Sequence, residues 1–292
     1  MEVSFLIVTK HRAKDLAITL DKLKLIIDSS RHEVLVFIDG CSDTEVLVNS
    51  YDWVEWTISK KSISASPARN ILYKKAKGGI FIGLDDDAHP ISNNFIASVE
   101  ACFNQNPKLG IIAFQEVRGL FESDAQALKK SKQLEAHHAS DFVGCGFAIR
   151  KHVYDVTNGF PVWMDIYGEE TALAIEVLDM GYTILYKPNI KVNHRVDVEL
   201  RKKRGRNYYR FQRQLKNSIN FYIVYYKYPL KKVLKVLWHN LVKYAFKDSK
   251  YFKCYVVAVF KTIIDLSRVL KYRNPVQQET IEQKINLQGL RY

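Results

Sequence analysis

Three acidic residues stand together directly after an apolar run. The stretch Phe81–Leu84 (FIGL) leads into Asp85, Asp86 and Asp87, and Pro90 ends the segment, because proline is excluded from the interiors of strands and helices. Neighbouring carboxylates repel one another unless a cation lies between them, and Mg²⁺ and Mn²⁺ prefer carboxylate oxygens together with phosphate and water. We therefore predict a site for a divalent metal and a phosphorylated ligand at the end of a buried strand. The alternative is a solvated acidic turn that binds nothing.

The elements that must position these carboxylates are strands of a buried sheet. Val3–Thr9 (VSFLIVT) and Glu33–Asp39 (EVLVFID) are apolar, β-branched runs that end in polar residues, and Ala13–Ser29 between them has leucines and isoleucines at helical spacing. Parallel strands covered on both faces have this pattern, and their ligand sites lie at the carboxyl ends of the strands. We therefore expect the ends of these two strands to lie beside Asp85 at one edge of the sheet.

Further helices and strands alternate along the chain. A helix is predicted over Ser66–Ala76, with Ser66 as its N-cap and Pro67 in its first turn. The other predicted elements are the strand Ile80–Leu84, the helix Phe95–Asn104, the strand Gly110–Phe114, the helix Glu169–Met180 and the strand Tyr182–Tyr186. This alternation predicts an α/β fold with a mixed or mostly parallel sheet.

Short polar motifs follow these elements in order. Thr9–Arg12 (TKHR) comes after the first strand, Asp39–Asp43 (DGCSD) after the second, and Pro67–Asn70 (PARN) begins the helix before the acidic triplet. This ordered set resembles the nucleotide-sugar half of the family 2 glycosyltransferases. The resemblance implies the Rossmann-like GT-A fold and a DXD-type metal motif at Asp85–Asp87.

The second half of the pattern lies further along the chain. Gly144–Arg150 (GCGFAIR), Asn158–Phe160 (NGF) and Tyr167–Glu170 (YGEE) are similar to the acceptor half of the same family. The set is most similar to the bacterial rhamnosyltransferase-like members, in which a histidine corresponding to His194 follows the next strand. The resemblance covers residues 1–200. It implies an inverting, metal-dependent transfer of a sugar from a nucleotide diphosphate to a hydroxyl group.

The resemblance also implies roles on the donor side of the site. The positions that match donor-binding residues of the family are Thr9, Arg12, Asp39, Arg69, Asp85 and Asp86. Of these, Asp39 would hydrogen-bond the nucleotide base, Arg69 would lie near the nucleotide or its phosphates, and Asp85 and Asp86 would hold the ribose and the sugar. Asp87 would bind Mn²⁺ or Mg²⁺, and His194 would complete the metal shell or touch the diphosphate.

The acidic pair Glu169 and Glu170 matches the catalytic positions of the family. The second acid of that pair serves as the general base and is often an aspartate, so the longer Glu170 departs from the pattern. The alternative role of this carboxylate is stabilisation by the helix dipole alone. A second departure lies in the following helix, where Arg210, Arg213 and Lys216–Asn217 stand in place of an arginine–asparagine pair.

Positive charge is concentrated in the C-terminal part of the chain. Residues 201–273 carry 20 Lys and Arg against two acidic residues, so a segment of charge +18 follows a remainder of −5 in a chain of +13. This asymmetry predicts a GT-A catalytic domain over residues 1–200 and a basic, amphipathic, α-helical region over residues 201–292. The basic region predicts an anionic partner surface.

Two amphipathic helices are predicted in the basic region, over Pro229–Phe246 and Tyr251–Leu270. The apolar positions of the first are Leu230, Val233, Leu234, Leu237, Leu241 and Tyr244. Basic amphipathic helices attach to anionic membranes, so we expect peripheral binding at the cytoplasmic face of a membrane. The alternative is that these helices pack on the catalytic domain or on a second subunit. Nucleic acid is not expected, because no recognition motif accompanies the charge.

The remaining composition restricts the compartment. The chain has no predicted signal peptide and no apolar run of the roughly 20 residues that a membrane span needs. Its four cysteines lack metal or redox spacing and are expected to be free thiols in a reducing compartment, which favours the cytoplasm.

The sequence thus predicts a glycosyltransferase of cell-surface polysaccharide synthesis. Its donor would be a UDP-sugar or, next, a dTDP-sugar, and its acceptor a glycan or a lipid-linked molecule. One alternative is a sugar nucleotidyltransferase, which would carry a glycine-rich phosphate loop after the first strand, whereas Thr9–Lys14 contains no glycine. The other is a non-catalytic carbohydrate-binding or membrane-scaffold relative, which would not need both Asp87 and Glu170.

Overall fold

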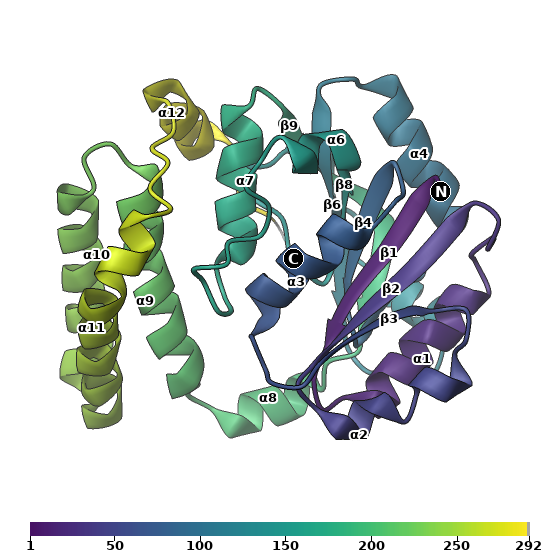
Figure 1. The fold of residues 1–292 in the computed structure, drawn as a ribbon, viewed down its shortest axis with the longest axis horizontal. Coiled ribbons are helices and arrows are strands. Elements are labelled where there is room, and N and C mark those ends of the chain that lie inside the picture. The colour runs from purple at the N-terminus through teal and green to yellow at the C-terminus, as the bar shows by residue number, and fades with distance from the viewer. Residues whose placement is uncertain (291–292) are drawn as a thin grey trace.

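A mixed β-sheet lies at the centre of the fold (Figure 1). The computed structural model describes residues 1–290, and within them the strand order is β3-β2-β1-β4-β8-β6-β9-β5, with β7 paired to β9. The strands are β1 (Val3–Thr9), β2 (His32–Asp39), β3 (Glu55–Ser59), β4 (Ile80–Asp85), β5 (Ala88–Pro90), β6 (Leu109–Arg118), β7 (His137–His138), β8 (Gly146–Arg150) and β9 (Thr183–His194). The predicted α/β fold with a mixed sheet is confirmed.

The sheet brings the predicted ligand positions to one edge. β1 pairs in parallel with both β2 and β4, and Thr9 lies opposite Ile38, so the carboxyl ends of these three strands meet. β5 follows the acidic triplet and pairs antiparallel with β9, which places His194 opposite Ala88. The sheet thereby connects the two halves of the sequence at the acidic triplet.

Helices cover both faces of the sheet, because the side chains of each strand alternate between two cores. In β1, Leu6 belongs to one core, with α3 (Ala65–Lys75) and α7 (Glu169–Asp179). Phe5 and Ile7 belong to the other core, with α1 (Ala13–Lys24) and α4 (Phe95–Gln105). The shorter helices in the connections are α2 (Ser42–Glu45), η1 (Val48–Ser50), α5 (Asp124–Lys130) and α6 (Lys151–Asp155).

Some predicted boundaries and one predicted cap are wrong. Helix α3 begins at Ala65 after Ser64, so Ser66 is not its N-cap; the Ser66 hydroxyl instead donates to the Pro161 carbonyl at 2.7 Å. Helix α1 ends at Lys24, five residues before the predicted end. Strands β6 and β9 run on to residues 118 and 194, beyond their predicted ends, because they pair with each other as far as His194.

Most of the helices after β9 form a layer beside α7, whereas the first of them, α8 (Val198–Arg204), lies apart at the bottom of Figure 1. The others are α9 (Tyr208–Tyr225), α10 (Leu230–Lys243), η2 (Ala245–Lys247), α11 (Ser249–Leu270) and α12 (Gln278–Asn286). Helix α9 packs on α10 and α11, and Tyr225 at its end donates a hydrogen bond of 2.6 Å to the buried Glu176 of α7. The chain then returns to the sheet region, where Ser140 donates its N–H to the Gln288 carbonyl at 3.1 Å.

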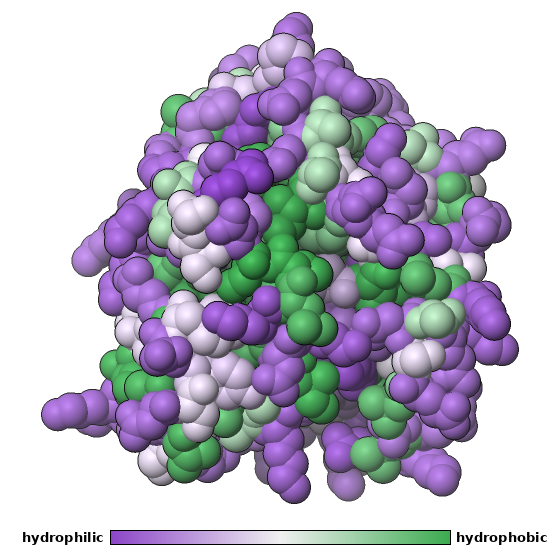
Figure 2. Space-filling model, turned by 90° about the vertical axis from the view of Figure 1, so that its right-hand side faces the viewer, coloured by the Kyte–Doolittle hydropathy of each residue, from purple (hydrophilic) through white to green (hydrophobic). Residues whose placement is uncertain are grey.

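The face that carries the sheet edge strands and α1 is largely polar (Figure 2). Figure 2 shows the face at the right-hand side of Figure 1, where hydrophilic side chains surround a central group of apolar ones. No helix in residues 1–290 has the length and apolar character to cross a membrane. The four cysteines are free, as expected: Cys41 and Cys145 are buried, and Cys102 and Cys254 are partly buried.

Candidate active site

Asp86 and Asp87, which follow the last residue of β4, contact the same arginine. Asp86 accepts a hydrogen bond from Thr9 Oγ1 at 2.8 Å, and Arg12 Nη1 lies 3.3 Å from its Oδ1. Arg12 Nη2 lies 2.5 Å from Asp87 Oδ2, so one cation offsets the repulsion between two adjacent carboxylates. Burial raises the pKa of Asp86 to about 7; the charge of Arg12 opposes this rise and the charge of Asp87 adds to it.

A chain of polar contacts leads from Asp87 to β6. His194 Nε2 lies 3.1 Å from Asp87 Oδ1, and His194 Nδ1 pairs with Glu116 Oε1. Burial would lower the pKa of His194, but its contacts with Asp87, Cys145 and Glu116 raise it to about 12. Burial would raise the pKa of both carboxyls, yet their contacts with His194 lower each to about 2. His194 therefore carries a positive charge between two carboxylates.

Asp85, Asp87 and His194 form a candidate metal site. One ligand atom of each lies within 4.8 Å of those of the other two. Two carboxylates and an imidazole suit Mn²⁺ or Mg²⁺ when phosphate or water completes the shell. The side chains fit such an ion, because Asp87 Oδ1 is buried and lies only 3.1 Å from His194 Nε2, so one ion could contact both atoms once the imidazole is neutral. The structure thus brings the predicted ligands Asp87 and His194 together and adds Asp85.

Arg69 connects the acidic strand end to the acidic pair of α7. Its Nη2 lies 2.9 Å from Asp85 Oδ1, and its Nη1 lies 3.1 Å from Glu170 Oε1 and 3.4 Å from Glu169 Oε1. The guanidinium is buried, and a Cβ at Gly144 would lie 2.3 Å from Glu170 Oε1 and 2.7 Å from Arg69 Nη2. A side chain at Gly144, two residues before β8, would therefore displace Arg69 and Glu170 from this arrangement.

The two glutamates of α7 hold protons more tightly than ordinary carboxyls. Burial, followed by the charge of Glu170, raises the pKa of Glu169 to about 8, although Arg69 opposes the rise. Burial also raises the pKa of Glu170, again against the charge of Arg69. Because both carboxyls contact Arg69 and lie next to each other, they can share a proton near neutral pH. A general base requires a pKa in that range, so that it can take up a proton and release it again.

Asp39 is held by the loop before α3. It accepts hydrogen bonds from Ser62 Oγ and Ile63 N, both at 2.6 Å, and from Ser64 N at 3.1 Å. A strand-end aspartate that organises a turn makes contacts of this kind. Contact with a nucleotide base stays a prediction for Asp39.

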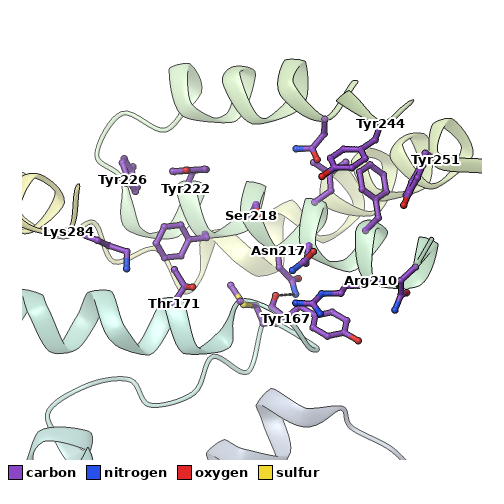
Figure 3. A pocket seen from close by; sticks show the side chains of 18 of the residues that line it. Tyr167, Thr171, Arg210, Asn217, Ser218, Tyr222, Tyr226, Tyr244, Tyr251 and Lys284 are labelled. Atoms are coloured by element: carbon purple, nitrogen blue, oxygen red, sulfur yellow. Dashed lines mark hydrogen bonds between the residues drawn. The ribbon is translucent and has the colours of Figure 1, made fainter. Parts of the chain in front are cut away.

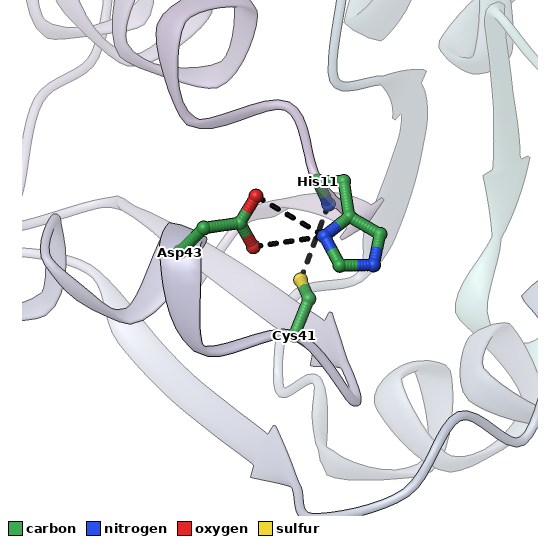
Figure 4. Close-up of side chains that lie close together, drawn as sticks. All are labelled: His11, Cys41 and Asp43. Carbon is green, nitrogen blue, oxygen red and sulfur yellow. Dashed lines mark hydrogen bonds and ion pairs between the residues drawn. The ribbon is translucent and has the colours of Figure 1, made fainter.

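A second polar cluster joins the loops after β1 and β2 (Figure 4). His11 Nδ1 lies 3.0 and 3.1 Å from the two carboxylate oxygens of Asp43. The backbone N–H of His11 donates a hydrogen bond to Cys41 Sγ at 3.2 Å. His11 has a φ of 56°, which a non-glycine residue adopts only when its surroundings hold it. The cluster ties the motif at Thr9–Arg12 to the motif at Asp39–Asp43.

The residues that depart from the family pattern hold the loop before α7. Arg213 pairs with Asp165. Asn217 Nδ2 donates to the carbonyls of Ile166 and Tyr167 at 2.8 and 3.0 Å, and to Asp165 Oδ1 at 3.1 Å. Tyr167 has a φ of 73° directly before the acidic pair, so these contacts fix a strained turn. Trp163, in the same loop, packs in the core.

The sequence did not single out Glu116, which contacts His194. The predicted strand ended at Phe114, two residues before this acid. In the structure β6 continues through Gln115 and Glu116, both buried. A buried acid within a strand is a signal for a polar partner, but its identity depends on the pairing of β6 with β9, which the sequence does not show.

Comparison with solved structures confirms the GT-A fold. The chain is similar to GalNAc-T7 in complex with UDP, GalNAc and Mn²⁺, at 15% identity and a TM-score of 0.62, over 80% of this chain and 49% of that chain. The chain thus spans about half the length of that protein. It is similar to the mannosyltransferase PcManGT from Pyrobaculum calidifontis in complex with GDP-Man and Mn²⁺, at 15% identity and a TM-score of 0.57, over 97% and 83% of the two chains.

A third solved structure covers nearly the whole chain. S. aureus TarS 1–349 in complex with UDP is 12% identical, with a TM-score of 0.59 over 93% of this chain and 90% of that chain. No protein-family model matches the sequence, and no curated protein matches it significantly. At these identities the likeness concerns the fold.

Replacement of Glu169 by Gln is expected to stabilise the metal-free protein in a pH-dependent way. An unfolded glutamate ionises near pH 4.3, but the folded protein keeps this proton to about pH 8, so the folded state binds more protons over that window and wild-type stability falls as pH rises. The gain from Glu169→Gln should therefore be small at pH 4 and largest at pH 8. Urea denaturation in EDTA at pH 4, 6 and 8 measures it.

Glu2 provides the opposite control. A hydrogen bond from Arg31 lowers the pKa of this exposed carboxyl, so Glu2→Gln should lose stability at neutral pH instead of gaining it. A gain for Glu169→Gln that is equal at all three pH values would show that the carboxyl does not hold its proton.

Proposed function

We propose that the protein is a metal-dependent, inverting glycosyltransferase. It transfers a sugar from a nucleotide diphosphate to a hydroxyl of a glycan or lipid-linked acceptor in the synthesis of cell-surface polysaccharide. The observation that supports this best is the arrangement at the sheet edge of a GT-A fold, where a candidate metal site and a buried acidic pair flank Arg69. Assignment to the rhamnosyltransferase-like subgroup and division of the chain at residue 200 are parts of the same proposal.

On the donor side, Asp87 and His194 hold Mn²⁺ or Mg²⁺, with Asp85 close enough to contribute. A bound divalent ion neutralises the charge that develops on the departing diphosphate. Thr9 and Arg12 hold Asp86 and Asp87 in place. In this arrangement Asp85 and Asp86 contact the ribose and the sugar of the donor. Solved structures of the same fold contain UDP or GDP-Man, two of them with Mn²⁺, which supports a nucleotide-sugar donor.

On the acceptor side, Glu170 acts as the general base. The acceptor oxygen attacks the anomeric carbon from the face opposite the diphosphate, its proton moves to the Glu170 carboxylate, and the bond from the sugar to the diphosphate breaks. Arg69 holds Glu170 in place and Glu169 lies next to it, so the pair can retain the proton until it is released to solvent.

The sugar nucleotidyltransferase alternative finds less support. The turn after β1 contains His11 and Arg12 but no glycine. It therefore cannot form the glycine-rich loop that binds phosphate in such enzymes. The non-catalytic alternative would not need the candidate metal ligands and the acidic pair of α7 to lie together on one arginine at the sheet edge.

We further propose that α10 and α11 attach the protein to an anionic membrane surface. On α10 the prediction placed Leu230 and Leu234 on the same apolar face as Val233 and Leu237, but only the latter two pack on neighbouring helices. An outer apolar stripe stays exposed on each helix, from 42% to 70% by residue: Leu230, Leu234, Trp238 and Val242 on α10, and Val256, Phe260, Ile263 and Ile264 on α11. Lysines flank both stripes, which suits insertion between anionic headgroups.

A nucleotide panel tests the donor site. UDP, GDP, dTDP and CMP, each with and without Mn²⁺, are compared for their effect on the melting temperature. One of them, with UDP expected first and dTDP next, should raise it by about 5 °C or more at 100-fold excess over Kd, and only with Mn²⁺. Asp87→Asn should lose this shift, whereas Asp52→Asn, at an exposed aspartate, should keep it. A chain that responds to no nucleotide under any condition is not an active transferase.

Replacement of Glu170 by Gln tests the base. Nucleotide binding should be unchanged, while turnover, measured as release of the nucleoside diphosphate from the matching sugar nucleotide with glycerol as acceptor, should fall by about 10²- to 10⁴-fold. Glu170→Asp, which restores the residue that the family more often has, should recover part of the rate. Equal turnover in Glu170→Gln and the wild type would remove this side chain from the mechanism.

Flotation with vesicles tests membrane attachment. The protein should float with phosphatidylglycerol-containing vesicles and stay behind with purely zwitterionic ones. The double variant Trp238→Ser and Phe260→Ser removes two exposed rings and should weaken binding by about tenfold or more. Leu25→Ser, at an apolar residue that is 80% exposed and far from these helices in the sequence, is the control and should float like the wild type. Wild-type protein that never floats would contradict the proposal.

A further inference from the structure

A cavity of about 640 Å³ lies between the start of α7 and the C-terminal helices (Figure 3). One wall is the loop before α7 together with its first turn, from Met164 to Thr171. The opposite wall is α9, and α10, α11 and α12 contribute Asn240, Tyr251 and Lys284. Nothing in the sequence pointed to this space, because its walls are more than 30 residues apart in the chain.

The lining combines aromatic rings with side chains that form hydrogen bonds. It contains five tyrosines, at positions 167, 222, 226, 244 and 251, and four carboxamides, at positions 207, 214, 217 and 240. Thr171 and Ser218 add hydroxyl groups. Flat rings cover the apolar face of a sugar, and amides and hydroxyls match its hydroxyl groups as donors and acceptors. A purely apolar ligand would leave these polar groups without partners.

One lining residue has a buried acceptor without a partner. Asn217 is 1% exposed, and its Nδ2 is fully used by three acceptors of the loop at Asp165–Tyr167. Its Oδ1 is buried and accepts no hydrogen bond from any described residue. Such an atom costs free energy, and because it is buried a ligand hydroxyl would reach it only when neighbouring side chains of the lining move aside.

The charge of the lining is positive. Arg210 stacks on the Tyr167 ring, with 5.0 Å between its guanidinium carbon and the ring centroid, and no ion pair with an acidic residue is found for it within residues 1–290. Lys284 donates to the Ser140 carbonyl and lies 4.0 Å from Asp141, so its charge is partly matched. No Asp or Glu is among the residues that line the cavity. The lining therefore favours a ligand that carries a negative group near Arg210.

The cavity adjoins the acidic pair through the chain itself. Tyr167 and Gly168 line it immediately before Glu169 and Glu170, and Thr171 lines it immediately after them. Thr171 also donates a hydrogen bond of 2.6 Å to Asp141, which fixes the first turn of α7 at the cavity wall. Neither glutamate lines the cavity itself, since both face Arg69, so an acceptor held there would extend past the turn at Tyr167–Gly168 to bring its reacting hydroxyl to Glu170.

We propose that this cavity binds the acceptor, and that the acceptor is an oligosaccharide chain bearing a negatively charged group. This inference rests on the proposed function, since it assigns the second substrate of the same reaction. Tyrosine rings stack on the sugar units, the carboxamides and hydroxyls of the lining form hydrogen bonds with the sugar hydroxyls, and Arg210 binds the negative group.

Saturation-transfer NMR with two tetrasaccharides tests the proposal. The acidic probe is tetragalacturonate and the neutral probe is maltotetraose. The wild type should bind both, and the acidic one more tightly. Ser218→Trp fills the cavity and should abolish both signals, whereas Ser267→Trp, at an exposed serine of α11, should keep them. Binding of neither probe, or binding that survives Ser218→Trp, would overturn the proposal.

Arg210→Gln tests the charge. Affinity for tetragalacturonate should fall by about three- to tenfold and affinity for maltotetraose should not change, with Arg204→Gln, at an exposed arginine of α8, as the matched control. Equal affinities of the wild type for both probes would overturn the assignment of a negative group.

The donor assay separates this inference from the function on which it rests. Ser218→Trp should keep the stabilisation by nucleotide and Mn²⁺, which shows that the variant is folded and that its donor site is intact. If nucleotide stabilises the wild type but neither tetrasaccharide binds, the acceptor assignment fails alone. If no nucleotide acts and saccharide binding still depends on the cavity, the proposed transferase fails and a carbohydrate-binding protein remains.

Discussion

The buried guanidinium of Arg69 is the interaction on which the rest of the site depends. Asp85 at the end of β4 and the acidic pair of α7 come from distant parts of the chain, and each carboxylate is costly to bury by itself. One cation with several donors in a rigid plane can bind all three groups, which a lysine could not do with the same geometry. Removal of the cation would leave these carboxyls without their partner, which for a buried pair typically costs about 3–5 kcal/mol, so Arg69 stabilises the fold and the site together.

A second constraint is the short pairing of β5 with β9. It reverses the chain directly after the acidic triplet and sets His194 against Asp87, while β6 supplies Glu116 behind the imidazole. In the metal-free state His194 is charged and occupies the place of a cation between carboxylates. A metal ion needs the neutral imidazole, so metal binding must release a proton and becomes more favourable as pH rises. The polar chain therefore stabilises the fold without metal and also carries the proposed ligands for one.

The sequence predicted the features that depend on neighbouring residues, and it missed those that depend on contacts between distant segments of the chain. Strand patterns are local, and they were enough to place Thr9, Asp39 and Asp85 at one edge of an α/β sheet. Contacts between distant segments were not predictable from the residues alone: Arg69 was expected near the nucleotide, and in the structure it binds three acids. Glu116 was missed because the end of β6 depends on its partner strand. The cavity and the free Oδ1 of Asn217 depend on how α9 packs against α7, which no periodicity encodes.

The C-terminal helices show why helical periodicity alone was ambiguous here. The apolar positions of α10 belong to two faces, one that packs through Val233 and Leu237 and one that stays exposed through Leu234 and Trp238. A helix that is apolar on two sides needs two partners, and only the inner one is a helix of this chain. Helix α9 lies between: it packs on α10 and α11, and it also forms the wall of the cavity beside α7. A membrane that binds the outer stripes of α10 and α11 and a glycan that enters the cavity would therefore contact the same layer of packed helices. The proposed attachment would in that way hold the acceptor site at a fixed distance from the surface on which a lipid-linked acceptor is found.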